Sequence, residues 1–178
     1  MKIIKPKFWE KKYSLMSLLM FPIAALLQLL LVIKKILTVE HSFKIPIICI
    51  GNIYIGGTGK TPLSIMIANE LIKNKRKPAI IKKYYSKHID EHNLINSSLN
   101  SLFLSKDRSL AINDAQKKHY NIAILDDGFQ DTSLFHDISI IVVDAEIGFG
   151  NGLCLPAGPL REPISVGLSR GDILLSIG

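Results

Sequence analysis

The 178-residue sequence predicts an α/β fold: a mainly parallel, doubly wound sheet, preceded by one hydrophobic helix. Three observations carry this prediction. Short apolar runs alternate with stretches suited to helices after residue 41, a pattern typical of parallel strands with crossover helices. Several runs are unbroken, as in strands that are covered on both faces. A glycine-rich loop directly follows the first run, at the place where such folds begin a helix.

The N-terminal apolar run covers residues 15–33 and carries no charge. As a helix it would be about 28 Å long, close to the ~30 Å hydrocarbon core of a bilayer. A secretory signal peptide is disfavoured because the run ends at two lysines and lacks a small-x-small cleavage site. A buried core helix is the other alternative, but a domain this small has little room for one. We therefore expect residues 1–40 to be a membrane-associated helix with basic flanks, either spanning the bilayer or lying in one leaflet.

The formal net charge of +7 suits an anionic partner. Lysines gather around the apolar run and again in residues 73–87, with few aromatic residues between them. A single-strand nucleic-acid platform needs such aromatics, so we expect acidic membrane lipids and no nucleic acid. Cys49 and Cys154 have neither metal-ligand nor disulfide spacing, and we expect both to be reduced and intracellular.

The remaining chain, residues 41–178, is expected to form one nucleotide-binding domain. Apolar runs predict strands at residues 45–50, 78–81, 101–104, 121–125, 138–144 and 172–176. Helices are predicted at residues 60–74 and 107–119. No internal repeat or low-complexity linker interrupts this pattern.

The stretch "YIGGTGKTP" has the parts of a phosphate-binding loop. Glycines allow close backbone approach, Lys60 can reach the outer phosphates, and the Thr61 hydroxyl can bind Mg²⁺. The strict pattern has glycine where this chain has Tyr54, so the loop is a variant P-loop, and the fold class is of the P-loop NTPase type. A glycine-rich turn without ligand is the alternative. The expected cradle comprises Tyr54, Ile55, Gly56, Gly57, Thr58, Gly59, Lys60 and Thr61.

Two aspartates follow the predicted strand at residues 121–125, in "NIAILDDGFQD". Ligands of doubly wound sheets bind outside the carboxyl ends of the strands. We therefore expect Asp126 or Asp127 to hold Mg²⁺ together with Thr61. An ordinary Asp-Asp-Gly turn is the alternative.

Together, "GNIYIGGTGKTP", "DDGFQ" and "FGNGLCLPAGPLREP" resemble the tetraacyldisaccharide 4'-kinases. The resemblance implies transfer of the γ-phosphate of ATP to the 4'-hydroxyl of a lipid A disaccharide precursor, giving lipid IVA. It also implies the cytoplasmic face of a bacterial inner membrane, and Mg²⁺ as the cofactor of the nucleotide. The last stretch is the most discriminating, because a generic P-loop protein has no need of "LPAGPLREP".

The resemblance also suggests a catalytic base. The family's Gly-Asp-Glu-Pro is reduced here to "IDEH", which puts Asp90 at the position of the base. An acidic start of a helix is the alternative reading of these residues. The family's Ser-Arg-Gly-Tyr corresponds to "KKYYSK", residues 82–87, so an arginine that contacts substrate or phosphate is expected to be lost.

Arg161 in "PLREP" is a candidate for binding the transferring phosphoryl group, because a planar guanidinium pairs with two phosphate oxygens at once. The alternative is a structural ion pair with Glu162.

Members of the family that this chain resembles are longer and carry a further C-terminal region. We therefore expect this chain to be either a fragment or a shortened form. Two other functions stay open. One is a membrane-anchored ATP-binding protein without kinase activity, favoured by the altered "KKYYSK" and "IDEH". The other is a membrane-associated P-loop ATPase, which leaves "LPAGPLREP" unexplained. The oligomeric state is not predicted.

Overall fold

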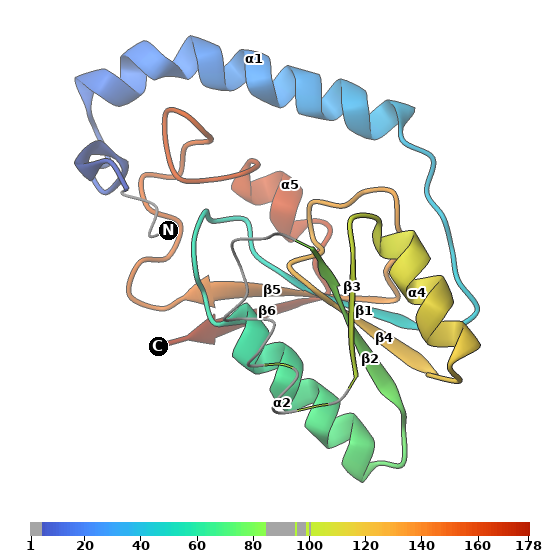
Figure 1. The fold of residues 1–178 in the computed structure, drawn as a ribbon. Coiled ribbons are helices and arrows are strands. Elements are labelled where there is room, and N and C mark those ends of the chain that lie inside the picture. The colour runs from blue at the N-terminus through green and yellow to red at the C-terminus, as the bar shows by residue number, and fades with distance from the viewer. Residues whose placement is uncertain (1–4, 85–94, 96–98, 100) are drawn as a thin grey trace.

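A computed structural model describes residues 5–84, 95, 99 and 101–178, and its centre is a six-stranded parallel sheet (Figure 1). The strand order is β3-β2-β4-β1-β5-β6, and every neighbouring pair is parallel. All six predicted strands are confirmed, with ends shifted by at most two residues. Their bounds are β1 (Ile47–Gly51), β2 (Pro78–Lys83), β3 (Leu102–Ser105), β4 (Ile122–Asp126), β5 (Ile138–Asp144) and β6 (Ile173–Ile177).

The two predicted crossover helices are also confirmed, as α2 (Lys60–Lys73) and α4 (Arg108–Lys117). Two short helices were not predicted, the 3-10 helix η1 (Lys7–Trp9) and α5 (Ile164–Leu168). Each is too short to show the 3.6-residue periodicity by which a helix is recognised in a sequence.

The central strands β1, β2, β4 and β5 are largely buried on both faces, which explains why they are apolar without alternation, whereas the edge strands β3 and β6 are more exposed. Ile80 and Ile124 point to the face covered by α2, where they pack with Leu63. Their chain neighbours Ile81 and Leu125 point to the opposite face, which α4 and α5 cover. Side chains at the ends of the strands follow the same alternation. Residues that pair in register near the carboxyl ends of β2 and β4 therefore point to the same face of the sheet.

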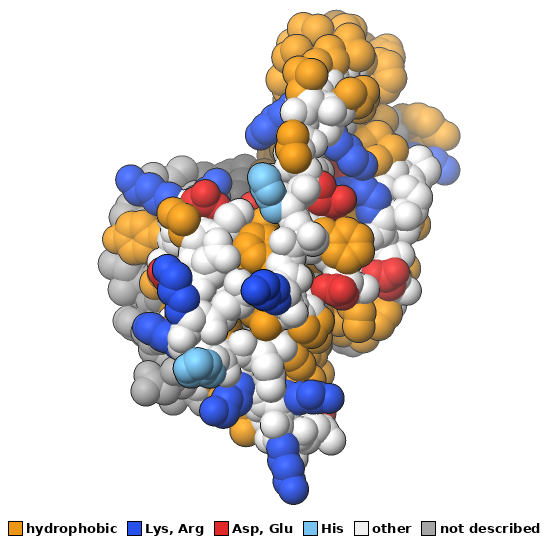
Figure 2. Space-filling view, turned by 90° about the vertical axis from the view of Figure 1, so that its right-hand side faces the viewer, with side chains coloured by type: hydrophobic (Ala, Val, Ile, Leu, Met, Phe, Trp, Pro, Cys, Tyr) orange, Lys and Arg blue, Asp and Glu red, His pale blue; other side chains and the backbone are white. Residues whose placement is uncertain are grey.

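The N-terminal helix α1 (Leu15–Leu37) lies along one side of the domain (Figure 1). By length and composition it could cross a membrane, and only 11% of its most apolar window is buried. Figure 2 looks at it nearly end-on and shows its apolar side chains gathered around the helix, apart from the body of the domain.

One stripe of α1 is fastened to the loop before α5. The Ser17 hydroxyl accepts a hydrogen bond from Asn151 Nδ2 (3.2 Å), and Gln28 Nε2 donates to the carbonyl of Arg161 (3.2 Å). Between them, Ala24 is buried. The polar Gln28 in an apolar helix is thus explained by a partner in the domain.

Close packing at the end of β1 predicts that one added methyl group at Gly51 lowers the stability of the fold. A Cβ at Gly51 would lie 2.2 Å from Phe129 Cβ, whereas a Cβ at Gly57 meets nothing within 4 Å. We expect Gly51→Ala to lower the free energy of unfolding by about 1–3 kcal/mol, because the core cannot accept the added group without moving. Gly57→Ala is the control and should change it by less than about 0.5 kcal/mol. Urea unfolding followed by circular dichroism measures both; equal values would contradict the packing argument.

Candidate functional site

The glycine-rich loop connects β1 to α2 and ends at Gly59, which caps the helix with a φ of 79°. This left-handed conformation favours glycine and turns the chain so that α2 starts at Lys60. The first N–H groups of a helix have no partner within the helix and attract anions. Asn52 stabilises the loop, because its Nδ2 donates hydrogen bonds to the Gly56 carbonyl (3.2 Å) and to Thr58 Oγ1 (3.1 Å).

Tyr54, which stands where a strict P-loop has glycine, is buried under the "LPAGPLREP" loop. It forms an isolated bridge with Leu160, and the next N–H, that of Ile55, donates to the Pro159 carbonyl (2.9 Å). The backbone of Tyr54 and Ile55 therefore joins the two loops. The remaining glycines of the loop still provide the close approach that a phosphate needs.

Asp126 ends β4 and points toward the first turn of α2. Its carboxylate is fully buried, and Oδ2 accepts hydrogen bonds from Thr61 Oγ1 (2.7 Å) and from Lys82 Nζ (2.5 Å). Oδ1 is buried and receives no hydrogen bond from the described residues. An orphaned buried carboxylate oxygen needs a physical explanation. The Asp126 carboxylate and the Thr61 hydroxyl that donates to it form a pair of oxygen ligands of the kind Mg²⁺ prefers.

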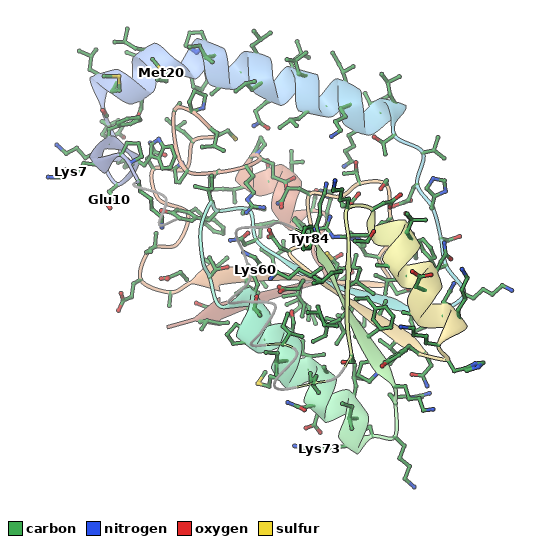
Figure 3. All side chains as sticks on the ribbon, in the orientation of Figure 1. Lys7, Glu10, Met20, Lys60, Lys73 and Tyr84 are labelled. Carbon is green, nitrogen blue, oxygen red and sulfur yellow. The ribbon has the colours of Figure 1, made fainter. Side chains whose placement is uncertain are left out.

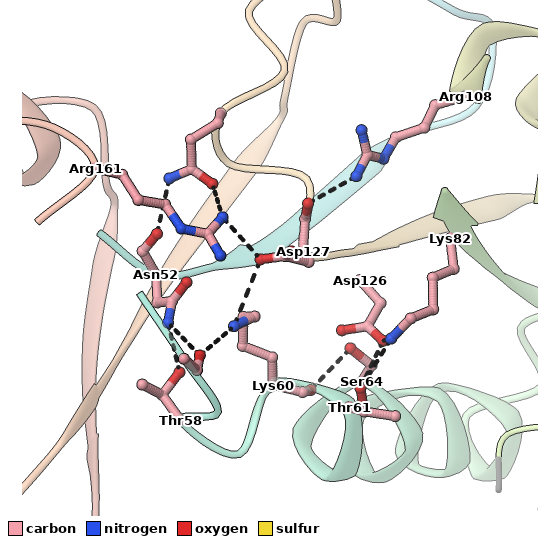
Figure 4. Close-up of polar contacts among 12 residues, drawn as sticks. Asn52, Thr58, Lys60, Thr61, Ser64, Lys82, Arg108, Asp126, Asp127 and Arg161 are labelled. Atoms are coloured by element: carbon pink, nitrogen blue, oxygen red, sulfur yellow. Dashed lines mark hydrogen bonds and ion pairs between the residues drawn. The ribbon is translucent and has the colours of Figure 1, made fainter. Parts of the chain in front are cut away.

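Asp127 turns away from Thr61 and meets two cations instead (Figure 4). Its Oδ1 lies 3.5 Å from Lys60 Nζ and 3.4 Å from Arg161 NH1, while its carbonyl accepts from Arg108 (2.7 Å). Burial acts to raise the pKa of Asp127, but the charges of Lys60, Arg161 and Arg108 outweigh it and hold the pKa below its ordinary value. Burial also lowers the pKa of Lys60, against the opposing effect of Asp127. Both side-chain contacts of Asp127 are long for ion pairs, at 3.5 and 3.4 Å.

Arg161 is held over the phosphate loop by a chain of side chains. Its NH1 donates to Gln130 Oε1 (2.6 Å), and Gln130 Nε2 donates to the Asn52 carbonyl (2.8 Å). The alternative pairing with Glu162 is wrong: that carboxylate accepts two hydrogen bonds from Arg170 (2.6 and 2.7 Å). The guanidinium of Arg161 thus faces the P-loop side of the domain.

The fold therefore brings together five of the predicted site residues, Lys60, Thr61, Asp126, Asp127 and Arg161 (Figure 4). Asp90, the predicted base, lies outside the described residues. Sequence reasoning assigned no role to Lys82, Asn52, Gln130 or Arg108. Asn52 and Gln130 stand inside the quoted motifs "GNIYIGGTGKTP" and "DDGFQ", which could have drawn attention to them.

A sequence profile of one enzyme family, described as tetraacyldisaccharide-1-P 4'-kinase (LpxK), matches residues 16–98 and 88–178 of this chain. The matched ranges contain the phosphate loop, both aspartates and Arg161. The chain belongs to this family. The resemblance read from the three sequence stretches is thereby confirmed, and so is the fold class.

Curated relatives agree with this assignment. The tetraacyldisaccharide 4'-kinase of Pelagibacter ubique is 44% identical over 99% of this chain, and that of Jannaschia sp. is 38% identical over 97% of it. The chain spans little more than half of these relatives, 56% and 58% of their lengths. A crystal structure of LpxK from Aquifex aeolicus in complex with ATP matches the fold with a TM-score of 0.78 at 24% identity, covering 91% of this chain and 59% of that one.

The loop after β4 is anchored by an acid-sensitive contact that yields a prediction. Asp131 accepts hydrogen bonds from Ser133 Oγ (2.6 Å) and from the buried Arg108 (2.9 Å). Burial acts to raise its pKa, but these bonds outweigh burial and bring the pKa below its ordinary 3.8. The unfolded chain then takes up the proton at higher pH than the folded chain. The contribution is therefore complete above the unfolded pKa and is lost as the pH falls through the lowered folded pKa.

Asp131→Asn should consequently be less stable than wild type at pH 7 and lose less stability from about pH 5 downward. The measurement is the urea unfolding free energy as a function of pH. Asp114→Asn is the control, because Asp114 is exposed and its carboxylate has, among the described residues, only a 3.6 Å contact with Lys117. An acid slope in Asp131→Asn as steep as in wild type would contradict the prediction.

Proposed function

We propose that this chain binds ATP with Mg²⁺ and carries the nucleotide site of a membrane-associated kinase acting on a tetraacyldisaccharide 1-phosphate. The observation that carries the proposal is the convergence of Lys60, Asp127 and Arg161 on one phosphate loop. Family membership supports the acceptor, since the matched family is that of the tetraacyldisaccharide-1-P 4'-kinases.

ATP is the proposed nucleotide. The related LpxK of Aquifex aeolicus was solved with ATP, and the loop here has the same ingredients that hold phosphates in other P-loop proteins. Of the predicted cradle, residues 54–61, the backbone of residues 56–61 would hold the phosphates, because the Ile55 N–H is already bonded to the Pro159 carbonyl. Lys60 would exchange its long contact with Asp127 for the β- and γ-phosphates, and Arg161 would meet the charge of the transferring group.

Thr61 and Asp126 fit a Mg²⁺ ion better than Asp127 does, because Asp127 is directed at Lys60 and Arg161. The described residues contain no cluster of three or more His, Cys, Asp or Glu side chains that could bind a metal. Phosphate oxygens and water would therefore supply the other ligands, as is usual for Mg²⁺ in nucleotide sites. When bound, the ion neutralises charge that develops on the phosphates.

In the proposed reaction, the 4'-oxygen of the sugar attacks the γ-phosphorus, and the bond from that phosphorus to the β–γ bridging oxygen breaks, releasing ADP. The hydroxyl proton passes to a carboxylate, for which Asp90 is the candidate. Phosphoryl transfer depends mainly on positioning and charge. The hydrogen-bond chain from Asn52 through Gln130 to Arg161 supplies such positioning.

Residues 1–40 are proposed to attach the domain, residues 41–178, to the inner membrane. Ser17 and Gln28 bind α1 along the domain, while large side chains such as Leu26 and Leu30 are more than half exposed. A helix held lengthwise in this way suits a position in the plane of the lipid surface. Lys34 and Lys35 in its last turn would meet acidic headgroups.

The kinase proposal predicts transfer of labelled γ-phosphate from ATP to tetraacyldisaccharide 1-phosphate in detergent micelles with Mg²⁺. Lys60→Ala should lower the rate on the order of 100-fold or more, since a preorganised charge at the phosphates is lost. Lys73→Ala is the control, because Lys73 lies at the other end of α2 (Figure 3) and pairs only with the exposed Glu70 among the described residues.

Asp90→Ala is tested in the same assay against Asp114→Ala, and ATP binding is measured in parallel. Transfer by wild type that survives in Lys60→Ala would refute the phosphate-loop assignment. ATP binding without any transfer by wild type would favour the alternative of a nucleotide-binding protein without kinase activity.

The membrane proposal predicts co-sedimentation with vesicles that contain acidic lipids. Leu26→Glu combined with Leu30→Glu should abolish binding, because two charges would enter the apolar region. Leu110→Glu is the matched control: this leucine on α4 is equally exposed, at 58% against 58% for Leu26. Equal vesicle binding by both variants would contradict a role of α1 in attachment.

A further inference from the structure

Lys82 is a buried cation for which the proposed reaction gives no role. It is the second-last residue of β2 and lies opposite Asp126 in the register of the sheet, so both side chains point to the α2 face. Its Nζ lies 2.5 Å from Asp126 Oδ2 and 3.1 Å from Thr61 Oγ1. Only 7% of its side chain is exposed.

The Thr61 hydroxyl and the Asp126 carboxylate are the groups assigned above to Mg²⁺, and Oδ2 is the carboxylate oxygen that lies beside Thr61 Oγ1. A Mg²⁺ ion binds its ligands at about 2.0–2.1 Å. An ion bound to both Thr61 Oγ1 and Asp126 Oδ2 would occupy the space next to them that the ammonium now fills. The two cations would also repel strongly at this distance in a buried setting. Lys82 and a metal ion therefore cannot hold Asp126 Oδ2 in this arrangement at the same time.

We propose that Lys82 is a resident counter-ion of the metal position. Its ammonium pairs with Asp126 and holds the Thr61 hydroxyl beside it when no metal is bound, and it leaves Asp126 when a divalent cation enters. Free metal then binds weakly. A metal ion that arrives with a nucleotide brings phosphate charges that offset the repulsion, so the site favours the metal–nucleotide complex over the metal alone. This inference rests on the proposed assignment of Thr61 and Asp126 to the metal.

The test is a titration of the full chain in detergent micelles with Mn²⁺, followed by electron paramagnetic resonance, without nucleotide. Lys82→Met removes the charge and keeps an unbranched side chain of similar length. We expect it to bind Mn²⁺ on the order of tenfold more tightly than wild type. Its melting temperature should fall in metal-free buffer, because Asp126 is left unpaired, and should recover on addition of Mg²⁺.

Matched variants separate this role from a purely structural one. Lys82→Arg keeps the charge and should show no gain in Mn²⁺ affinity. Lys83→Met changes the next lysine, which alternates to the other side of β2, and should resemble wild type. Adding Asp126→Asn to Lys82→Met should remove the gain. If Lys82→Met does not fold at any metal concentration, Lys82→Gln provides the same comparison.

An unchanged or weaker Mn²⁺ affinity in the neutral variants would overturn the inference. That result leaves the proposed function standing if wild type still transfers phosphate with Mg²⁺. Failure of wild type and Lys82→Met to bind Mn²⁺ even with ATP would instead refute the metal assignment of Thr61 and Asp126, and the inference with it.

Discussion

The burial of the Asp126 carboxylate is the constraint on which the site depends. A charge without access to water is tolerated only if it is paired and hydrogen-bonded, because the loss of hydration costs several kcal/mol or more. The pairing partners come from the end of β2 and the first turn of α2. The register of β2 on β4 and the start of α2 must therefore both be correct for this one carboxylate to be stable. Folding of the sheet and assembly of the phosphate loop are coupled in this way.

Around that carboxylate, the carboxyl edge of the sheet carries an excess of well-fixed cations. Lys60, Lys82, Arg108 and Arg161 face Asp126, Asp127 and Asp131, and most of the contacts run between different elements. This arrangement suits the binding of an anion, because each cation is already oriented. The carboxylates keep the cations in place while no anion is bound. The positive side chains thus outnumber the negative ones in this group, which suits the phosphate of the proposed function.

The sequence was sufficient to predict every strand of the sheet, because each is a short apolar run, and the central strands are buried on both faces. It also predicted that the phosphate loop and the two aspartates would lie together, since both follow strands whose carboxyl ends share one edge. It could not predict the partner of Lys82, which depends on β4 inserting between β1 and β2. The bond of Gln130 to the Asn52 carbonyl joins positions 78 residues apart, and no periodicity reports such a contact. The helix α5 was missed because five residues are too few for a pattern.

The hydrogen bonds that fasten α1 have a geometric consequence for the choice of acceptor. Gln28 is bonded to the backbone carbonyl of Arg161, whose guanidinium lies near the phosphate loop, so the helix is connected directly to a residue of the site. A lipid surface that holds α1 would therefore fix the height of the phosphate loop above the headgroups. The site would then favour acceptors whose reactive hydroxyl lies at that height above the bilayer. The protein and the acceptor would meet by diffusion in the plane of the membrane.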